Sequence, residues 1–136
     1  AGLQNALTSR FSEDLRVLAI PFTEQVPLYM DACDVLLTKP GGISSTEAAV
    51  KGIPIIHTPP IPGVETRNAQ FFAERGMSIV APNEDSAADN ALRLAADAPQ
   101  RARMLEAQRQ YLSRDAAEHI AARILEGRSP LTDATA

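Results

Sequence analysis

The sequence predicts an α/β fold in which helices flank a parallel sheet. Its 136 residues are enough for one domain with a hydrophobic core. Short apolar runs alternate with helical patterns, which is the order expected of parallel strands joined by crossover helices. The chain is 45% hydrophobic but only 4% aromatic, so Ala, Leu, Ile and Val are expected to fill that core.

Four apolar runs are the strand candidates. Each is almost continuously hydrophobic, which indicates burial on both faces of the sheet. They are residues 16–20, 34–38, 53–56 and 78–81. The helical patterns between them cover residues 1–11, 25–33, 44–51 and 66–75. Gly52 and Gly76 follow two of these patterns, where glycine favours a left-handed helix end.

Beyond residue 82 the sequence predicts three more helices. The first has Glu84 and Asp85 near its positive end, and its apolar face comprises Ala88, Ala91, Leu92 and Ala95. Pro99 separates it from the second, whose apolar face comprises Met104, Leu105, Gln108, Tyr111 and Leu112. The third carries Ala117, Ile120, Ala121, Ile124 and Leu125 between an N-cap at Ser113 and an end at Gly127. One domain over 1–127 and a disordered tail over 128–136 are expected.

Composition argues against several classes of function. With 13 basic and 17 acidic residues the net charge is -4, and no basic stripe is present to bind a nucleic acid. Cys33 is the only cysteine, which excludes an internal disulfide and indicates a small buried side chain. His57 and His119 lie far apart, and no residue set has the spacing of a metal site. No long apolar run or signal-like start is present, so a cytoplasmic chain is expected.

The stretch TKPGGISSTE, residues 38–47, places two adjacent glycines between a strand candidate and a helical pattern. The first amides of a helix have no intrahelical partners, and with the helix dipole they attract anions. Glycines keep side chains out of the approach path. The turn is also expected at the carboxyl end of a strand, where open α/β folds bind ligands. The amides expected to meet phosphate oxygens are those of Gly42, Ile43, Ser44 and Ser45.

The same stretch has a purely structural interpretation. Ser44 and Glu47 match a capping box, in which Ser44 caps the helix and Glu47 bonds back to the Ser44 amide. Neither the GxxxxGK[ST] pattern nor the GxGxxG pattern of nucleotide-binding loops is present. The spacing alone leaves capping and phosphate binding open. Lys39 likewise reads either as a phosphate ligand or as a solvated lysine.

A second loop, HTPPIPGVETRNAQ over residues 57–70, leaves the next strand candidate. Its prolines stiffen the chain, Gly63 permits a turn, and Glu65 and Asn68 begin the following helix. It is expected beside the double-glycine turn, because the two preceding strands are consecutive. The alternative is a rigid connection in which Glu65 only complements the helix dipole.

Residues 29–72, YMDACDVLLTKPGGISSTEAAVKGIPIIHTPPIPGVETRNAQFF, resemble the C-terminal domain of glycolipid glycosyltransferases. These are the monogalactosyldiacylglycerol synthases and processive diacylglycerol glycosyltransferases, relatives of the enzyme that adds GlcNAc to peptidoglycan lipid I. The motifs are ACD, a strand, TKPGG and TEA, then KGIPII and a PxPGxExxNA pattern. The likeness covers residues 14–82 well and continues loosely to 127.

The resemblance implies one half of a GT-B fold, a Rossmann-like domain that holds most of a nucleotide sugar. It assigns the diphosphate and donor sugar of a UDP-sugar to the turn formed by Gly41, Gly42, Ile43, Ser44, Ser45 and Thr46. It assigns the ribose hydroxyls to Glu47, the sugar to Glu65 and Asn68, and the uracil to backbone groups of Phe22 and Thr23. No metal or other cofactor is implied, because amides and helix dipoles can carry the leaving-group charge.

The resemblance also implies parts that this sequence lacks. The family's domain begins with another strand and a glycine-rich loop, and a separate N-terminal domain binds the lipid acceptor and supplies the general base. A fragment or one subunit of a split hexosyltransferase is therefore expected, inactive alone and without a catalytic residue of its own. Membrane contact, at the periphery of the bilayer, is expected only of the full enzyme.

Two other classes remain as alternatives. DVLLTKP resembles the strand, lysine and proline of signalling receiver domains, although the upstream acidic pair of that fold is missing. A noncatalytic interaction module would use the C-terminal helices as a binding surface. Uptake of phosphate from acetyl phosphate would identify the receiver, and association in light scattering would favour the interaction module.

Overall fold

The structure, a computed structural model, describes residues 2–126. Its centre is a parallel sheet of three short strands, β1 (Leu36–Thr38), β2 (Ile55–His57) and β3 (Ile79–Val80), in the order β1-β2-β3. Thr38 lies opposite His57, and His57 lies opposite Val80, so the carboxyl ends of the strands are level. Three of the four strand candidates are confirmed, each shorter than its apolar run.

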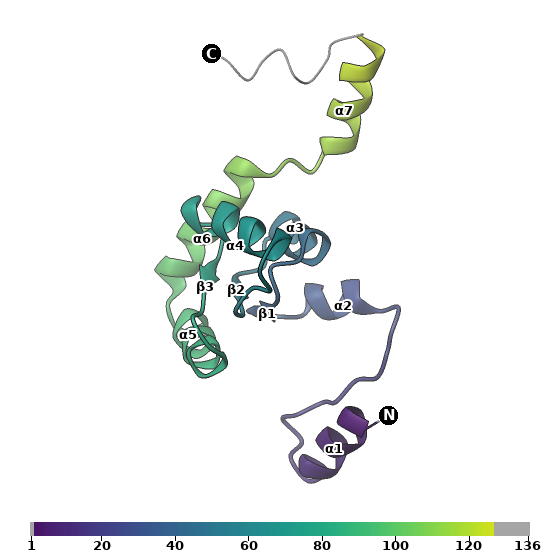
Figure 1. Cartoon of the computed structure of the whole chain (residues 1–136), viewed down its shortest axis with the longest axis vertical. Coiled ribbons are helices and arrows are strands. Elements are labelled where there is room, and N and C mark those ends of the chain that lie inside the picture. The colour runs from purple at the N-terminus through teal and green to yellow at the C-terminus, as the bar shows by residue number, and fades with distance from the viewer. Residues whose placement is uncertain (1, 127–136) are drawn as a thin grey trace.

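Helices cover both faces of this sheet (Figure 1). α2 (Val26–Asp31), α3 (Gly42–Lys51) and α4 (Val64–Glu74) pack on one face, and α5 (Glu84–Ala96) packs on the other. α6 (Ala98–Tyr111) contributes side chains to both layers. The α/β class with a parallel sheet and flanking helices is therefore confirmed.

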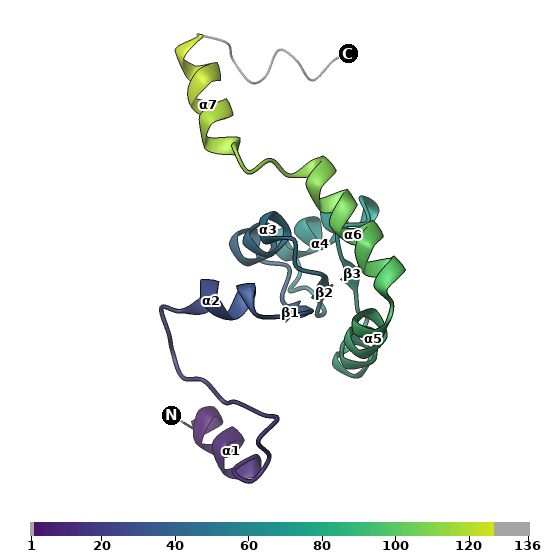
Figure 2. The same cartoon turned by 180° about the vertical axis from the view of Figure 1, so that it is seen from behind.

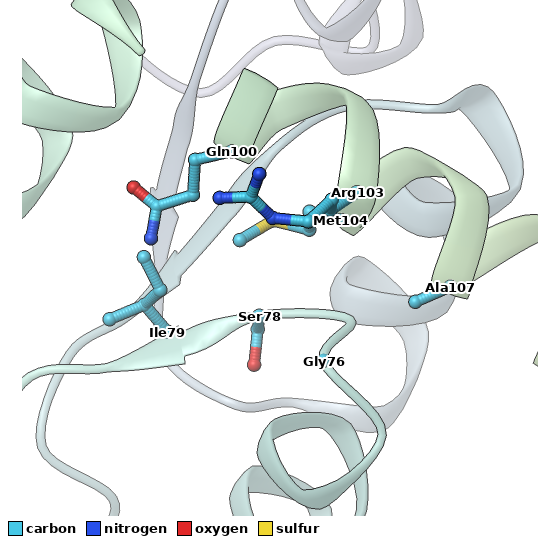
Figure 3. A pocket seen from close by; sticks show the side chains of 7 residues that line it. All are labelled: Gly76, Ser78, Ile79, Gln100, Arg103, Met104 and Ala107. Atoms are coloured by element: carbon cyan, nitrogen blue, oxygen red, sulfur yellow. The ribbon is translucent and has the colours of Figure 1, made fainter. Parts of the chain in front are cut away.

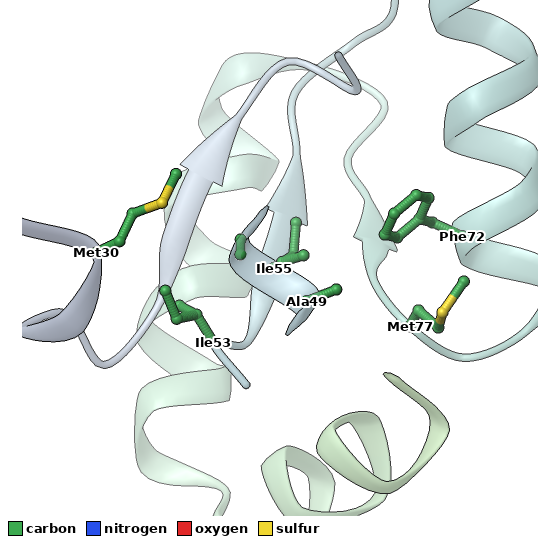
Figure 4. Close-up of a cluster of buried hydrophobic side chains, with 7 residues drawn as sticks. Met30, Ala49, Ile53, Ile55, Phe72 and Met77 are labelled. Carbon is green, nitrogen blue, oxygen red and sulfur yellow. The ribbon is translucent and has the colours of Figure 1, made fainter. Parts of the chain in front are cut away.

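The neighbouring residues Ile55 and Ile56 show how the core is divided. Both are fully buried, and they point to opposite faces of the sheet because side chains alternate along a strand. Ile55 lies in a cluster with side chains of α2, α3 and α4, including Phe72 (Figure 4). Ile56 lies in a second cluster with Leu94 of α5 and Met104 of α6. The central strand thus holds both layers together.

The predicted strand over residues 16–20 is wrong. That segment is irregular, with Val17 40% and Leu18 76% exposed. A strand needs a neighbour to bond its backbone, and the described strands pair only with one another. α1 (Gly2–Arg10), before this segment, buries no residue and lies apart from the sheet in both views (Figures 1 and 2). Residues 16–20 are therefore apolar in composition but do not form part of the packed core.

The three predicted C-terminal helices are present, but their buried faces differ from the predicted ones. In α5 the buried residues are Ala87 and Leu94, whereas Leu92 is 73% exposed. In α6 Met104 and Gln108 are buried as predicted, and Tyr111 is not. The face of α5 is set by the side chains of β2 and α6 that it meets, which the sequence period does not specify.

α7 (Ala116–Leu125) buries no residue and projects from the rest of the chain (Figure 2). Its predicted N-cap, Ser113, is not the cap. The cap position is Asp115, whose amide donates to Ser113 Oγ at 3.1 Å. The predicted end at Gly127 and the tail over 128–136 lie outside the described residues. Over residues 2–126, none of the helices has the length and apolar character needed to cross a membrane.

Two helix ends follow the sequence closely. Gly52 closes α3 with a φ of 76°, in the left-handed region that glycine adopts at low cost. Asn83 and Ser86 form a reciprocal capping box at the start of α5. Glu84 and Asp85 lie in the first turn of that helix, as predicted. These caps fix where the elements around the candidate site begin and end.

Candidate functional site

The double-glycine turn lies at the carboxyl end of β1, as predicted. β1 ends at Thr38, Pro40 is fully buried, and α3 begins at Gly42. The Gly41 amide donates to the Lys39 carbonyl at 2.7 Å, which tightens the chain before the helix. Asn68 of α4 donates from Nδ2 to the Pro40 carbonyl at 3.0 Å. This bond confirms that the second loop and its helix lie beside the turn.

The predicted capping box at Ser44 and Glu47 does not form. The helix starts three residues earlier than that box requires, with Gly41 and not Ser44 at the cap position and no side-chain cap. The amides of Gly42, Ile43 and Ser44 consequently have no hydrogen-bond partner within the part of the chain that is described. This arrangement leaves three converging donors at a positive helix end.

Ser45 differs from its three predecessors. Its amide already donates to the Gly41 carbonyl at 3.1 Å, and the residue is fully buried. It is therefore not available to a ligand in the manner expected from the sequence. Thr46 and Glu47 are exposed, and the Glu47 carboxylate has no hydrogen bond or ion pair in the described residues.

Neither glycine of the turn is required by the backbone. Gly41 is extended, with a φ of -74°, and Gly42 is helical, so an L side chain could occupy either position without strain. A Cβ at Gly41 would meet nothing within 4 Å, and a Cβ at Gly42 would meet only Asn68 Nδ2, at 3.8 Å. The space above the free amides is therefore open. The conformation of the turn itself therefore does not depend on the two glycines.

The three helices that begin at this edge of the sheet differ in their capacity for an anion. In α5 the Ser86 amide donates to Asn83 Oδ1, and the first turn carries two carboxylates. α4 has Glu65 in its first turn, and α3 has no acidic residue there. Because a negative side chain opposes a bound anion, α3 has the helix start best suited to one.

Glu65 and Asn68 lie near the turn but already have partners in the chain. Glu65 Oε2 accepts from the Ile61 amide at 2.7 Å, which stabilises the loop before α4. Gly63, at the cap position of α4, has a φ of 114°, a conformation open essentially only to glycine. The side chains of Glu65 and Asn68 are half-buried, and each keeps one oxygen without a hydrogen bond in the described chain.

Comparison with known proteins connects this geometry to glycosyltransferases. A processive diacylglycerol β-glucosyltransferase of Bacillus subtilis is 37% identical over 93 residues, which are 68% of this chain and 24% of that protein. The protein of the same name from Staphylococcus saprophyticus is 36% identical over 85 residues, 62% of this chain and 22% of its own length. The chain is similar to part of these glucosyltransferases. No protein-family model matches it.

The fold agrees with that similarity. The crystal structure of MurG from Acinetobacter baumannii matches 90% of this chain and 36% of its own, with a TM-score of 0.70 and 21% sequence identity. The Rossmann-like fold of the GT-B class, predicted from the sequence, is therefore confirmed. The chain spans about a quarter of the length of the curated glucosyltransferases it matches.

The structure does not bring Phe22 and Thr23, predicted from the glycosyltransferase resemblance, to the turn. Phe22 is 93% exposed. Thr23 Oγ1 accepts from the Gln25 amide at 3.0 Å and lines an apolar groove with Leu36, at the opposite end of β1 from the turn. No hydrogen bond joins either residue to the double-glycine turn within residues 2–126.

Another hollow of the chain lies between the start of β3 and α6, and Arg103 is the only charged side chain among its lining residues (Figure 3). Across the described residues, no group of three or more His, Cys, Asp or Glu side chains is placed to hold a metal ion.

Cys33 is half-buried against the first core cluster, and desolvation raises the pKa of its thiol.

A buried polar network beneath the turn was missed in the sequence. His57, the last residue of β2, has its Nε2 2.9 Å from Ser45 Oγ and its Nδ1 3.0 Å from Ser78 Oγ. His57 and Ser45 are fully buried, so the pair cannot attack a substrate as a hydrolase would. Burial lowers the pKa of His57 to about 4, and the ring is neutral at pH 7. The only sequence signal was a polar residue ending an otherwise apolar strand.

Proposed function

We propose that this chain is the donor-binding part of a glycosyltransferase and that the double-glycine turn holds the diphosphate of a UDP-sugar. The observation that carries the proposal is the start of α3, where the amides of Gly42, Ile43 and Ser44 lack partners beneath open space. A diphosphate has oxygens enough to accept from several such donors. The similarity to diacylglycerol glucosyltransferases supports a sugar nucleotide as its source.

The neighbouring side chains suit the rest of such a ligand. Glu47 lies four residues after Ile43, on the same exposed face of α3, and its unpaired carboxylate can accept from two vicinal ribose hydroxyls. The free oxygens of Glu65 and Asn68 can accept from sugar hydroxyls. Contacts from Phe22 and Thr23 to the uracil would require the segment before α2 to move toward the carboxyl edge of the sheet.

The acceptor and the chemical step belong to the proposal for the whole protein. The matched relatives are named for transfer of glucose to diacylglycerol, and this chain spans about a quarter of their length. We infer that the hexose goes to a lipid acceptor at the cytoplasmic surface of a membrane, and that the acceptor site and general base lie outside these residues. The chain alone is expected to bind the donor without transferring it.

Calorimetric titration of this chain with UDP and UDP-glucose tests the proposal. Wild-type protein is expected to bind UDP, and Glu47→Ala is expected to bind it more weakly while remaining folded. Equal affinity in both proteins would remove Glu47 from the site. The proposal would be overturned if well-folded protein bound neither ligand and a longer polypeptide, translated from the upstream coding sequence as well, also failed to bind.

A further inference from the structure

The His57 side chain connects the elements that form the double-glycine turn. Its Nε2 lies 2.9 Å from Ser45 Oγ, and Ser45 is the residue directly after the three free amides of α3. Its backbone lies opposite Thr38, the last residue of β1 before the turn. The imidazole of His57 therefore contacts Ser45, which follows the turn. The backbone of β2 pairs with Thr38, which precedes the turn.

The same ring also meets the other neighbours of the turn. Nδ1 lies 3.0 Å from Ser78 Oγ, next to β3. The rings of His57 and Phe72 in α4 make a T-shaped contact, with centroids 5.5 Å apart and an interplanar angle of 77°. Phe72 follows Asn68 by one helical turn, and Asn68 bonds the Pro40 carbonyl. Displacement of His57 would therefore disturb its contacts with both helices beside the turn, α3 and α4.

We infer that His57 is a positioning residue, which holds the start of α3 at the height and rotation that aim its free amides at the ligand. A neutral imidazole has one donor and one acceptor nitrogen, so the two serine hydroxyls give it a complete set of partners. Such bonds act only over a narrow range of distance and angle, whereas apolar contacts would let the helix slide or rotate. The inference rests on the proposed function for the identity of the ligand.

Two alanine variants test the two hydrogen bonds of His57 separately, the one to Ser45 beside the turn and the one to Ser78 away from it. Ser45→Ala removes the partner in α3, and Ser78→Ala removes the partner beside β3. Ser45→Ala is expected to weaken UDP binding by roughly fivefold to tenfold, the value of one lost hydrogen bond, and Ser78→Ala to have a smaller effect. Equal losses, or no loss in Ser45→Ala, would overturn the inference.

Another buried polar side chain, which lies away from the turn, provides a matched control. Gln108 of α6 is 1% exposed, and its Nε2 donates to the carbonyls of Ile53 and Met77, at the amino ends of β2 and β3. Gln108→Leu is expected to lower the unfolding temperature without changing the affinity for UDP. If it weakens UDP binding as much as Ser45→Ala does, then the effect is general loosening and not positioning.

Rescue and a ligand-free measurement complete the test. His57→Gln keeps an amide that can reach the position of Nε2, so it is expected to bind UDP better than His57→Leu. Hydrogen exchange at the amide of residue 45, which donates to the Gly41 carbonyl across the first turn of α3, followed by NMR without UDP, is expected to accelerate in Ser45→Ala and not in Gln108→Leu. This readout reports positioning even if the wild type fails to bind UDP, a result that would contradict the proposed function alone.

Discussion

Asn68 Nδ2 donates to the carbonyl oxygen of Pro40 across 3.0 Å, and so joins α4 to the double-glycine turn 28 residues earlier in the chain. The bond leaves the Asn68 carbonyl oxygen free and fixes the two loops that a donor sugar would meet. Asn68→Asp would set a carboxylate against that carbonyl, since an ionised Asp has no proton to donate. We expect a loss of about 1 to 3 kcal/mol of stability and weaker UDP binding at pH 7, measured by urea unfolding and calorimetry. Unchanged stability would show that the bond is not maintained in solution.

Gly42→Ala tests the open space above the free amides. Gly42 is helical and has room for a Cβ, so alanine is expected to raise the stability by up to about 1 kcal/mol. The new methyl group would stand where an anion approaches, and UDP affinity is expected to fall at least about tenfold, or 1.4 kcal/mol. Gly52→Ala, at the left-handed end of the same helix, is the control. It is expected to destabilise the protein by about 1 kcal/mol with unchanged UDP affinity.

Glu47 can be tested against two ligands that differ by the nucleoside. Because this carboxylate is exposed and has no partner in the described chain, Glu47→Gln is expected to alter stability by less than about 0.5 kcal/mol. It should weaken binding of UDP but not of inorganic pyrophosphate, which has no ribose. Glu118→Gln, an exposed change on α7, is the matched control and should leave both affinities as they are. A parallel loss for both ligands would show that Glu47 acts on the diphosphate.

Acid is expected to destabilise the fold through His57. Its pKa is about 4 in the folded chain because of burial, below the ordinary value of 6.5, so the unfolded chain takes up the proton first. The stability due to the neutral ring is complete above pH 6.5 and is lost as the pH falls toward 4, by about 3 kcal/mol in total. Urea unfolding of wild type and His57→Gln between pH 7 and 4 measures this loss. The variant should lack it, and identical pH slopes would contradict the assignment.

The N-terminal segment is expected to be dispensable for the core. α1 buries no residue, and Leu15 is 99% exposed. Removal of residues 1–15 should therefore change the unfolding temperature by less than about 2 °C, since a change of 1 kcal/mol corresponds to several degrees in a domain of this size. Differential scanning calorimetry of the shortened and complete chains gives the comparison. A large decrease would place α1 against the sheet in solution.

The sequence predicted where the double-glycine turn lies in the fold, but not the hydrogen bonds around it. It placed the double-glycine turn after a strand and beside the loop that carries Glu65 and Asn68, because parallel consecutive strands bring their carboxyl ends together. It did not show that α3 starts at Gly42 instead of Ser44. Helix starts depend on the backbone conformation of a few residues, and a capping pattern is only one of several ways to satisfy them.

The sequence by itself determined the local and periodic features, which are the apolar runs of the three strands, the helical patterns between them and a helix end such as Gly52, because neighbouring residues alone specify them. Only the tertiary structure decided that residues 16–20 stay unpaired and that His57 joins Ser45 to Ser78. A strand forms only where another strand offers its backbone, and a buried imidazole is stable only where distant hydroxyls meet it. Those partners lie 12 and 21 residues away from His57, beyond the reach of any pattern read along the chain.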